Sequence, residues 1–190
     1  MTKGRLEAFT DGVVAIIITI MVLEMKVPHG AGIEALQGAL PIFLAYVLSY
    51  INIGIFWSNH HHMLHATERV DGRVLWANLF LLFWLSLVPF VIRWIDEGGF
   101  TPVPVAAYGL VLAMAAIGYI LLQSTIIARN GRSSALATAV GSDLKGKLSL
   151  ALYLAAVPLA FVKEWIAIAI YVAVALLWLV PDRRIESMAK

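Results

Sequence analysis

Four of the five histidines in the chain lie within six residues of one another, and two acids follow shortly after them. The histidines are His60, His61, His62 and His65, and the acids are Glu68 and Asp71. On a helix, the spacing of four residues between His61 and His65 would place two imidazoles on one face, as in many zinc sites. Two other interpretations stay open. The histidines could stabilise a helix C-terminus, or one of them could hydrogen-bond a buried acid such as Asp11.

A second polar group surrounds the first apolar run of the chain, RLEAFTDGVVAIIITIMVLEMKVP. Arg5, Thr10 and Asp11 precede the run and Glu24 closes it. A signal peptide is not indicated, because acids offset the basic residues at the start and no small-residue cleavage site follows. Charged side chains are costly against lipid and normally face protein or water. We therefore expect a retained helix whose polar ends do not face lipid.

The composition indicates a membrane protein. Of the 190 residues, 61% are hydrophobic, and the mean hydropathy is +0.86, whereas soluble domains are roughly 45–50% apolar. The absence of cysteine excludes disulfides and thiolate metal sites. The net charge of +2 is spread along the chain, so nothing indicates nucleic acid as a partner.

Six apolar windows predict an all-α integral membrane protein with six transmembrane helices in a single domain, residues 1–190. The windows are approximately 9–27, 36–57, 74–95, 103–127, 148–162 and 165–180. With six spans both termini lie on one side, which collects eleven of the fourteen basic residues. These are Lys3, Arg5, Arg69, Arg73, Arg129, Arg132, Lys145, Lys147, Arg183, Arg184 and Lys190. The positive-inside rule therefore predicts cytoplasmic termini and a cytoplasmic loop over 128–147.

The first predicted helix carries a stripe that could line a pore. At about 100° per residue, Gly12, Ile16, Thr19 and Leu23 lie on one face, and Asp11 points away from it. Repeated around an axis, this face would give two aliphatic constrictions with a ring of hydroxyls between them. Such a stripe is also typical of packed membrane helices, in which a threonine bonds its own backbone. Geometry alone leaves both interpretations open.

Several polar residues are expected at one depth, near the cytoplasmic ends of the first three spans. They are Arg5, Thr10, Asp11, His60 and Asn78. Burial of such groups is costly unless they bond to one another. We therefore expect an interior polar network at this level.

Four short patterns follow one another through the first three spans. They are R-x-x-x-F-[ST]-D-G at Arg5, Phe9, Thr10, Asp11 and Gly12; W-x-x-H at Trp57 and His60; D-x-x-x-L-x-x-N-L at Asp71, Leu75, Asn78 and Leu79; and Pro89-Phe90. Together they resemble the signature of the transmembrane protein 175 family, the lysosomal potassium channels and their smaller prokaryotic relatives. The second half of the chain is similar only in general character.

The resemblance implies a homotetrameric potassium channel in a prokaryotic inner membrane, with the first helix lining the pore. It implies no enzyme activity and no cofactor, with potassium as the permeant ion and the lipid bilayer as its surroundings. The family's pore-lining positions fall on Ile16, Thr19 and Leu23. Its supporting network falls on Arg5, Phe9, Thr10, Asp11, His60 and Asn78. Thr10 departs from the usual serine but keeps the hydroxyl.

Two other functions stay open at this point. A proton- or metal-coupled transporter would use Asp11 and the His60–His65 cluster, with His61 and His65 as the candidate metal ligands. A haem-binding membrane subunit would need histidines facing one another across helices, whereas these lie at the end of one helix. The T-V-G-Y-G filter is absent from the sequence, so selectivity would have to come from the aliphatic rings and the threonine ring.

Overall fold

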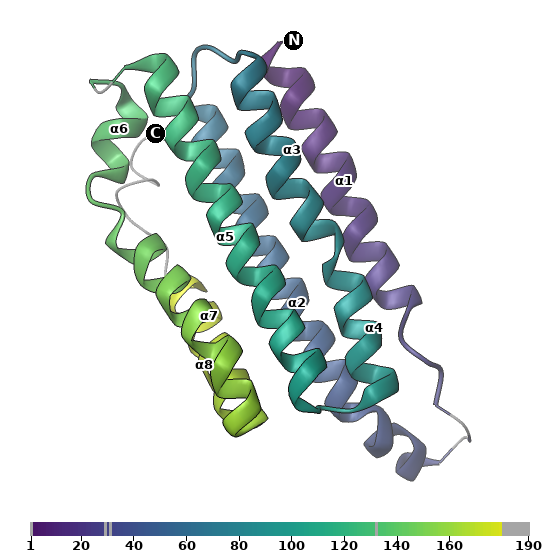
Figure 1. Ribbon diagram of the computed structural model, residues 1–190. Coiled ribbons are helices and arrows are strands. Elements are labelled where there is room, and N and C mark those ends of the chain that lie inside the picture. Colours follow the sequence, from purple (N-terminus) through teal and green to yellow (C-terminus); the bar gives the residue numbers. More distant parts are fainter. Residues whose placement is uncertain (1, 29, 31, 132, 180–190) are drawn as a thin grey trace.

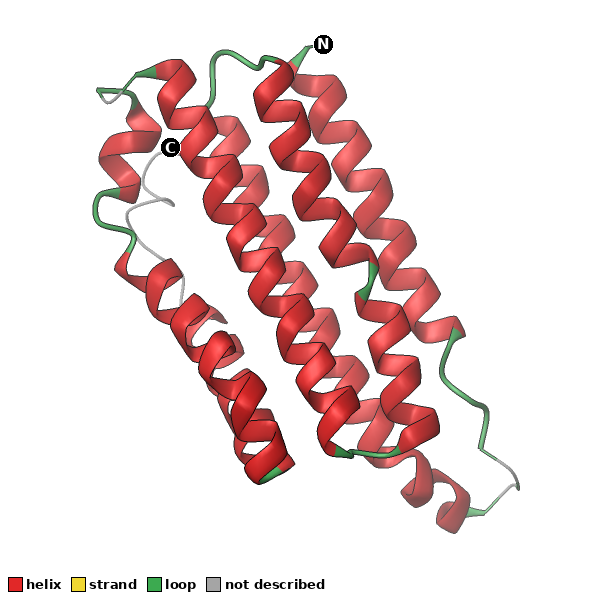
Figure 2. Ribbon diagram, viewed as in Figure 1, coloured by secondary structure: helices red, strands yellow, loops and turns green. Residues whose placement is uncertain are grey.

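A computed structural model describes every residue except 1, 29, 31, 132 and 180–190. The described residues form eight helices and no strand (Figure 2). The helices are α1 (Lys3–Leu23), α2 (Ile33–His65), α3 (Gly72–Ser86), α4 (Val88–Gly98), α5 (Pro102–Asn130), α6 (Ala135–Val140), α7 (Leu144–Val162) and α8 (Glu164–Leu179). The predicted all-α fold class is confirmed.

The long helices run alternately up and down in one bundle (Figure 1). α5 packs between α3 and α7, and α8 packs mainly on α7. α1 lies at the edge of the bundle, where it contacts α2, α3 and α4. The N-terminal end of the bundle contains the first turn of α1 and the last turn of α2. The opposite end contains the last turns of α1 and α4 (Figure 1).

Five helical segments are long and apolar enough to cross a membrane, by length and composition. They are α1, α2, α3 taken together with α4, α5 and α7. α8 is apolar but has only 16 residues, about 24 Å of helix. The structure thus gives five clear candidate spans and a shorter sixth where six were predicted. Val180, which ends the predicted sixth span, lies outside the described residues.

Helix bounds differ from the predicted windows where polar residues continue a helix. α1 begins at Lys3 and ends at Leu23, whereas the predicted window runs over 9–27. Hydropathy detects only apolar residues, so it misses the first two polar turns. The predicted long loop over 128–147 contains the end of α5, all of α6 and the start of α7. α6 begins at a serine cap, since the Ser134 hydroxyl accepts from the Ala137 amide at 3.3 Å.

The predicted third span is two helices in the structure. α3 ends at Ser86 and α4 begins at Val88, with Leu87 between them (Figure 2). Pro89 explains the interruption, because it has no N–H to donate and its ring would clash with the carbonyl four residues earlier. α4 is therefore a short helix set apart from α3.

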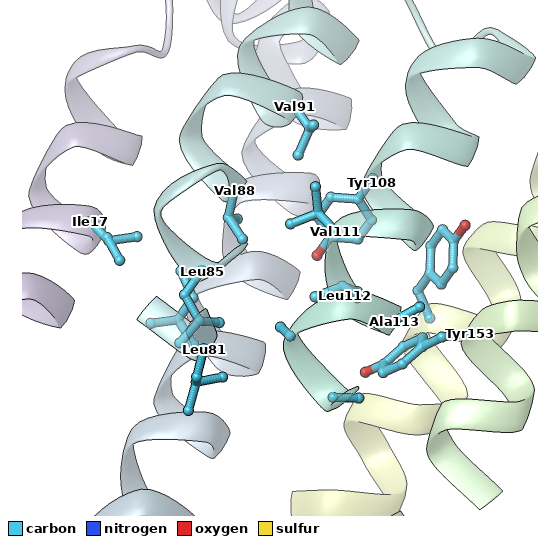
Figure 3. Packing of buried hydrophobic residues seen from close by; sticks show 14 of the residues in the cluster. Ile17, Leu81, Leu85, Val88, Val91, Tyr108, Val111, Leu112, Ala113 and Tyr153 are labelled. Carbon is cyan, nitrogen blue, oxygen red and sulfur yellow. The ribbon is translucent and has the colours of Figure 1, made fainter. Parts of the chain in front are cut away.

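The apolar core lies mainly between α3, α4 and α5. Figure 3 shows Leu81, Leu85 and Val88 beside Leu112 of α5, and Ile17 pointing toward them from α1. α3 and α5 approach closely at Gly118, where an added Cβ would lie 2.9 Å from the Leu81 Cα. Small residues at such crossings let membrane helices pack backbone to backbone.

Candidate functional site

α1 has two faces of different surroundings. One face is buried against the rest of the chain, through Leu6, Thr10, Val14, Ile17 and Met21. The opposite face carries the predicted stripe, where the side chains of Ile16 and Leu23 are 58% and 80% exposed and Thr19 is exposed as well. The helix has 21 residues, about 31 Å, which matches the hydrocarbon core of a bilayer. Within one chain, then, the stripe faces outward along the whole span.

The Thr19 hydroxyl has a fixed orientation in the helix. Its Oγ1 donates to the Ile16 carbonyl oxygen at 2.9 Å, three residues earlier. A hydroxyl has one hydrogen and two lone pairs, so this bond uses its only hydrogen. Toward anything outside the helix, the Thr19 oxygen can only accept, and it therefore presents partial negative charge.

A buried chain of polar side chains joins the first three helices. Asn78 Nδ2 of α3 donates to Thr10 Oγ1 of α1 at 3.0 Å, and Asn78 Oδ1 lies 2.8 Å from His60 Nε2 of α2. Because an amide oxygen only accepts, His60 donates from Nε2 in this arrangement. All three side chains are buried, the asparagine completely. Thr10, Asn78 and His60 thus form the core of the predicted polar network.

Asp11 belongs to a separate pair. Its Oδ1 accepts from Trp57 Nε1 of α2 at 2.8 Å, and both residues are exposed in the single chain. The histidine–Asp11 bond that the sequence left open does not form among the described residues, since His60 bonds Asn78 instead. Trp57 was part of the W-x-x-H pattern, but its sequence position gave no sign that its indole N–H would hold the acid.

Arg5 and Phe9 do not join the buried network. Both are exposed on α1, and the Arg5 side chain forms no hydrogen bond or ion pair with the residues that the structure describes. A different cation ties the start of α1 to α2, since Lys3 Nζ donates to the His65 carbonyl oxygen at 2.9 Å. The six residues of the predicted network therefore separate into a buried trio, two outward-facing side chains, and Asp11, which pairs with Trp57 from outside the six.

His61 and His65 lie on the same side of α2 as Trp57. The His61 ring lies 6.2 Å from Trp57 and 6.4 Å from His65, centroid to centroid. No group of three or more histidine or acidic side chains suited to a metal ion comes together in the described part of the chain. Among the described residues, no third ligand accompanies His61 and His65 to complete a metal site.

The opposite end of the bundle carries a charged cluster that the sequence did not point to. Arg93 Nη1 of α4 lies 2.6 Å from Glu24 Oε2, and its Nε lies 3.0 Å from Glu97 Oε1. A second ion pair also joins the segment after α1 to α4, since Lys26 Nζ lies 3.5 Å from Asp96 Oδ2. Between α1 and the α3–α4 junction, a groove of about 420 Å³ runs toward Arg93 and Glu24.

The chain is similar to known proteins over its first half and over its whole length. The family model described as the endosomal/lysosomal potassium channel TMEM175 matches residues 5–89. A potassium channel of Chryseobacterium sp. (strain P1-3) is 52% identical over 190 residues, which cover 100% of this chain and 99% of that protein. A potassium channel of Streptomyces collinus is 38% identical over 125 residues, covering 62% of this chain and 61% of that protein.

The fold is also similar to a solved structure. The crystal structure of a lysosomal potassium-selective channel TMEM175 homologue from Chamaesiphon minutus aligns with a TM-score of 0.78 and 27% identity, over 95% of this chain and 97% of that one. The matched region 5–89 contains the buried trio, the Asp11–Trp57 pair and the stripe of α1. With similarity along its full length as well, this multi-pass membrane chain belongs to the TMEM175 family.

Proposed function

We propose that the chain is a subunit of a potassium channel whose pore is lined by the exposed face of α1. One observation carries the proposal: Ile16, Thr19 and Leu23 all lie on the face of α1 turned away from the chain's own core. The relatives named potassium channels, one of them similar over its whole length, support potassium as the permeant ion. Membership of an ion channel family favours conduction over catalysis, and the proposed pore needs no cofactor.

The proposed assembly is a homotetramer. One chain supplies a single copy of the stripe, so a closed pore needs several copies arranged around an axis. The number four rests on the family resemblance. In this arrangement Ile16 and Leu23 form two aliphatic rings about 10.5 Å apart, two helical turns, and Thr19 forms a ring between them.

The stripe would provide the pore with both a barrier and a cation site. Narrow aliphatic rings gate by excluding water, and so they control ion passage without any charged group. The Thr19 oxygens, whose hydrogens are used within the helix, accept but do not donate toward the axis. Such oxygens favour cations over anions. We propose that sodium, which is more costly to dehydrate, is disfavoured where so few oxygens replace its water.

The buried face of α1 explains how the helix can present an apolar stripe and still be held firmly. Thr10 satisfies the Asn78 amide inside the chain, so the polar bonds that fix α1 leave the stripe free of competing partners. Polar bonds between membrane helices typically contribute about 0.6 kcal/mol, and up to roughly 2 kcal/mol. The trio therefore fixes the rotation of α1, and with it the direction in which the stripe faces.

We propose that the channel lies in the cell's inner membrane with both termini in the cytoplasm. The N-terminal end of the bundle carries Lys3 and Arg5 of α1 and Arg129 of α5, while the opposite end carries Lys26 and Arg93. The positive-inside rule places the first group in the cytoplasm. The other basic residues counted for this orientation include four outside the described residues: Arg132, Arg183, Arg184 and Lys190.

The test is ion flux in liposomes containing the purified protein, with the oligomer counted by native mass. We expect potassium flux exceeding sodium and proton flux, carried by a tetramer. Ile16→Asn and Leu23→Asn should change single-channel conductance, while Val22→Asn should not, because Val22 is exposed but lies about 100° around the helix from Leu23. Unchanged conductance in both stripe variants would exclude this pore.

The alternative, a proton- or metal-coupled transporter using Asp11 and the histidines, gives opposite results. It requires saturable, pH-coupled flux that is lost in His61→Ala or His65→Ala. The channel requires non-saturating potassium currents that both changes leave in place, because both rings belong to α2 and neither is part of the stripe on α1.

A further inference from the structure

Arg93 connects the end of α1 to a different helix. Its guanidinium pairs with Glu24 of α1 at 2.6 Å and with Glu97 of its own helix, α4, at 3.0 Å. Glu24 is the C-cap of α1 and follows Leu23 directly, and its backbone N–H still bonds the Ile20 carbonyl at 2.9 Å. We propose that Arg93 is a positioning residue that holds the last turn of α1 through Glu24, and so controls gating at Leu23. The inference rests on the proposed function, in which Leu23 lines the pore.

The last turn of α1 has little else in its own chain to hold it. In the last two turns only Ile17 and Met21 are buried, and Leu23 is 80% exposed. Beside these turns lies the groove of about 420 Å³, with Ile16 and Ile20 on one wall and Phe90 of α4 on the other. Packing density is therefore low where α1 approaches α4. The Glu24–Arg93 pair bridges that space at its end.

α4 is suited to transmit a movement. It is separated from α3 at Leu87, where Pro89 prevents a continuous helix, and Arg93 lies six residues beyond this break. A second ion pair, between Lys26 and Asp96, joins the segment after α1 to the same short helix. Breaks of this kind are where packed elements shift relative to one another. The end of α1 and α4 thus form one ion-paired unit beyond the break.

The exposure of the pair separates an effect on gating from an effect on folding. The Arg93 and Glu24 side chains are 55% and 30% exposed, and exposed ion pairs contribute little to folding. Their loss should leave the protein folded. A small preference for one position of α1, repeated in every subunit, is nevertheless enough to change the fraction of time that a channel is open.

The experiment is single-channel recording of Arg93→Gln, Glu24→Gln and the double variant in potassium. Each single variant should change the open probability by about twofold or more, and the double variant should add nothing further, because either change breaks the same pair. Arg93→Lys should restore much of the wild-type behaviour. Glu97→Gln is the matched control: it removes the pair within α4, keeps the pair to α1, and should gate like wild type.

Cross-linking gives a second test that does not depend on charge. The chain has no cysteine, so Glu24→Cys with Arg93→Cys introduces two thiols in each subunit and no others. A short bis-methanethiosulfonate reagent, which joins the two thiols through disulfide bonds with loss of methanesulfinate, should restore wild-type open probability in this variant. A reducing agent cleaves those disulfides and should reverse the effect. Restoration would show that a covalent link between positions 24 and 93 is enough to restore gating, without the charges of the ion pair.

The outcomes that overturn the inference are distinct from those that overturn the proposed function. A wild-type protein that carries no potassium current refutes the proposed function, and the inference fails with it. A conducting wild type whose open probability is unchanged in Arg93→Gln and Glu24→Gln refutes the inference alone. So does a Glu97→Gln variant that gates like Arg93→Gln, or a cross-link that restores nothing.

Discussion

Asn78 donates to the Thr10 hydroxyl at 3.0 Å while its carbonyl oxygen lies 2.8 Å from the His60 ring nitrogen, so a single amide joins α3 to α1 and to α2. The asparagine is fully buried. Removing it leaves a hydroxyl and an imidazole N–H without their partner, in surroundings where unsatisfied polar groups are costly. Through this asparagine the buried face of α1 is linked to both α2 and α3.

Asn78→Ala should therefore destabilise the folded chain by about 1–3 kcal/mol and lower the potassium current at equal protein density. Thermal unfolding in detergent and liposome flux measure the two effects. Asn59→Ala is the matched control, because among the described residues the Asn59 side-chain amide donates only to the Ile55 carbonyl of its own helix, at 2.8 Å. Equal stability of the two variants would show that the bond from Asn78 to α1 does not stabilise the folded chain more than a bond within one helix does.

Cysteine substitution can test which side of α1 faces the conduction path. In a chain without native cysteine, Leu23→Cys should be modified by a charged thiol reagent, and the potassium current should fall as it reacts. Val22→Cys is also on an exposed position, but it is turned about 100° away, so its modification should leave the current largely unchanged. Block through Val22→Cys but not Leu23→Cys would mean that a different face lines the pore.

The polar trio could be predicted from the sequence because depth in the membrane is readable from the position of a residue in its span. Depth does not give direction around the helix. Thr10 and Asp11 are adjacent and lie about 100° apart, so they cannot both face Asn78, and Asp11 meets Trp57 instead. Arg5 is eleven residues before Ile16, which puts both on nearly the same face, and it is exposed with the stripe.

Two other features needed the structure. The pairing of Glu24 with Arg93 depends on which helices are neighbours. The two residues are 69 positions apart in the sequence, and no sequence pattern indicates the pairing. The break at Leu87 was hidden because the run around Pro89 is apolar throughout. Hydropathy reports which residues tolerate lipid, and a proline in such a run is compatible with a kinked span as well as with two helices.

The proposed cation site makes a specific prediction at Thr19. Thr19→Val keeps the shape of the side chain but removes the oxygen, so potassium conductance should fall about twofold to tenfold, in line with the free energy of one lost polar contact. Thr19→Ser keeps the hydroxyl and should conduct nearly as well as wild type. Single-channel recordings in symmetrical potassium measure this. A valine variant with wild-type conductance would remove Thr19 from the conduction path.

Gly118 links the packing of the bundle to the position of the trio. A Cβ at this position would lie 2.9 Å from the Leu81 Cα, and backbone cannot move aside as a flexible side chain can. Gly118→Ala must therefore push α3 away from α5, at a cost of about 1–3 kcal/mol for overpacking.

Leu81 lies one helical turn after Asn78, so the same shift should weaken the bond from Asn78 to Thr10 and reduce the potassium current as well. Gly54→Ala is the control, since nothing lies within 4 Å of a Cβ added there in the described chain. An alanine in a helix with open space is neutral or stabilising, by about 0.5–1 kcal/mol. The two changes should thus shift the unfolding temperature in opposite directions or by clearly different amounts. Equal shifts would show that the close approach of α3 and α5 does not constrain this bundle.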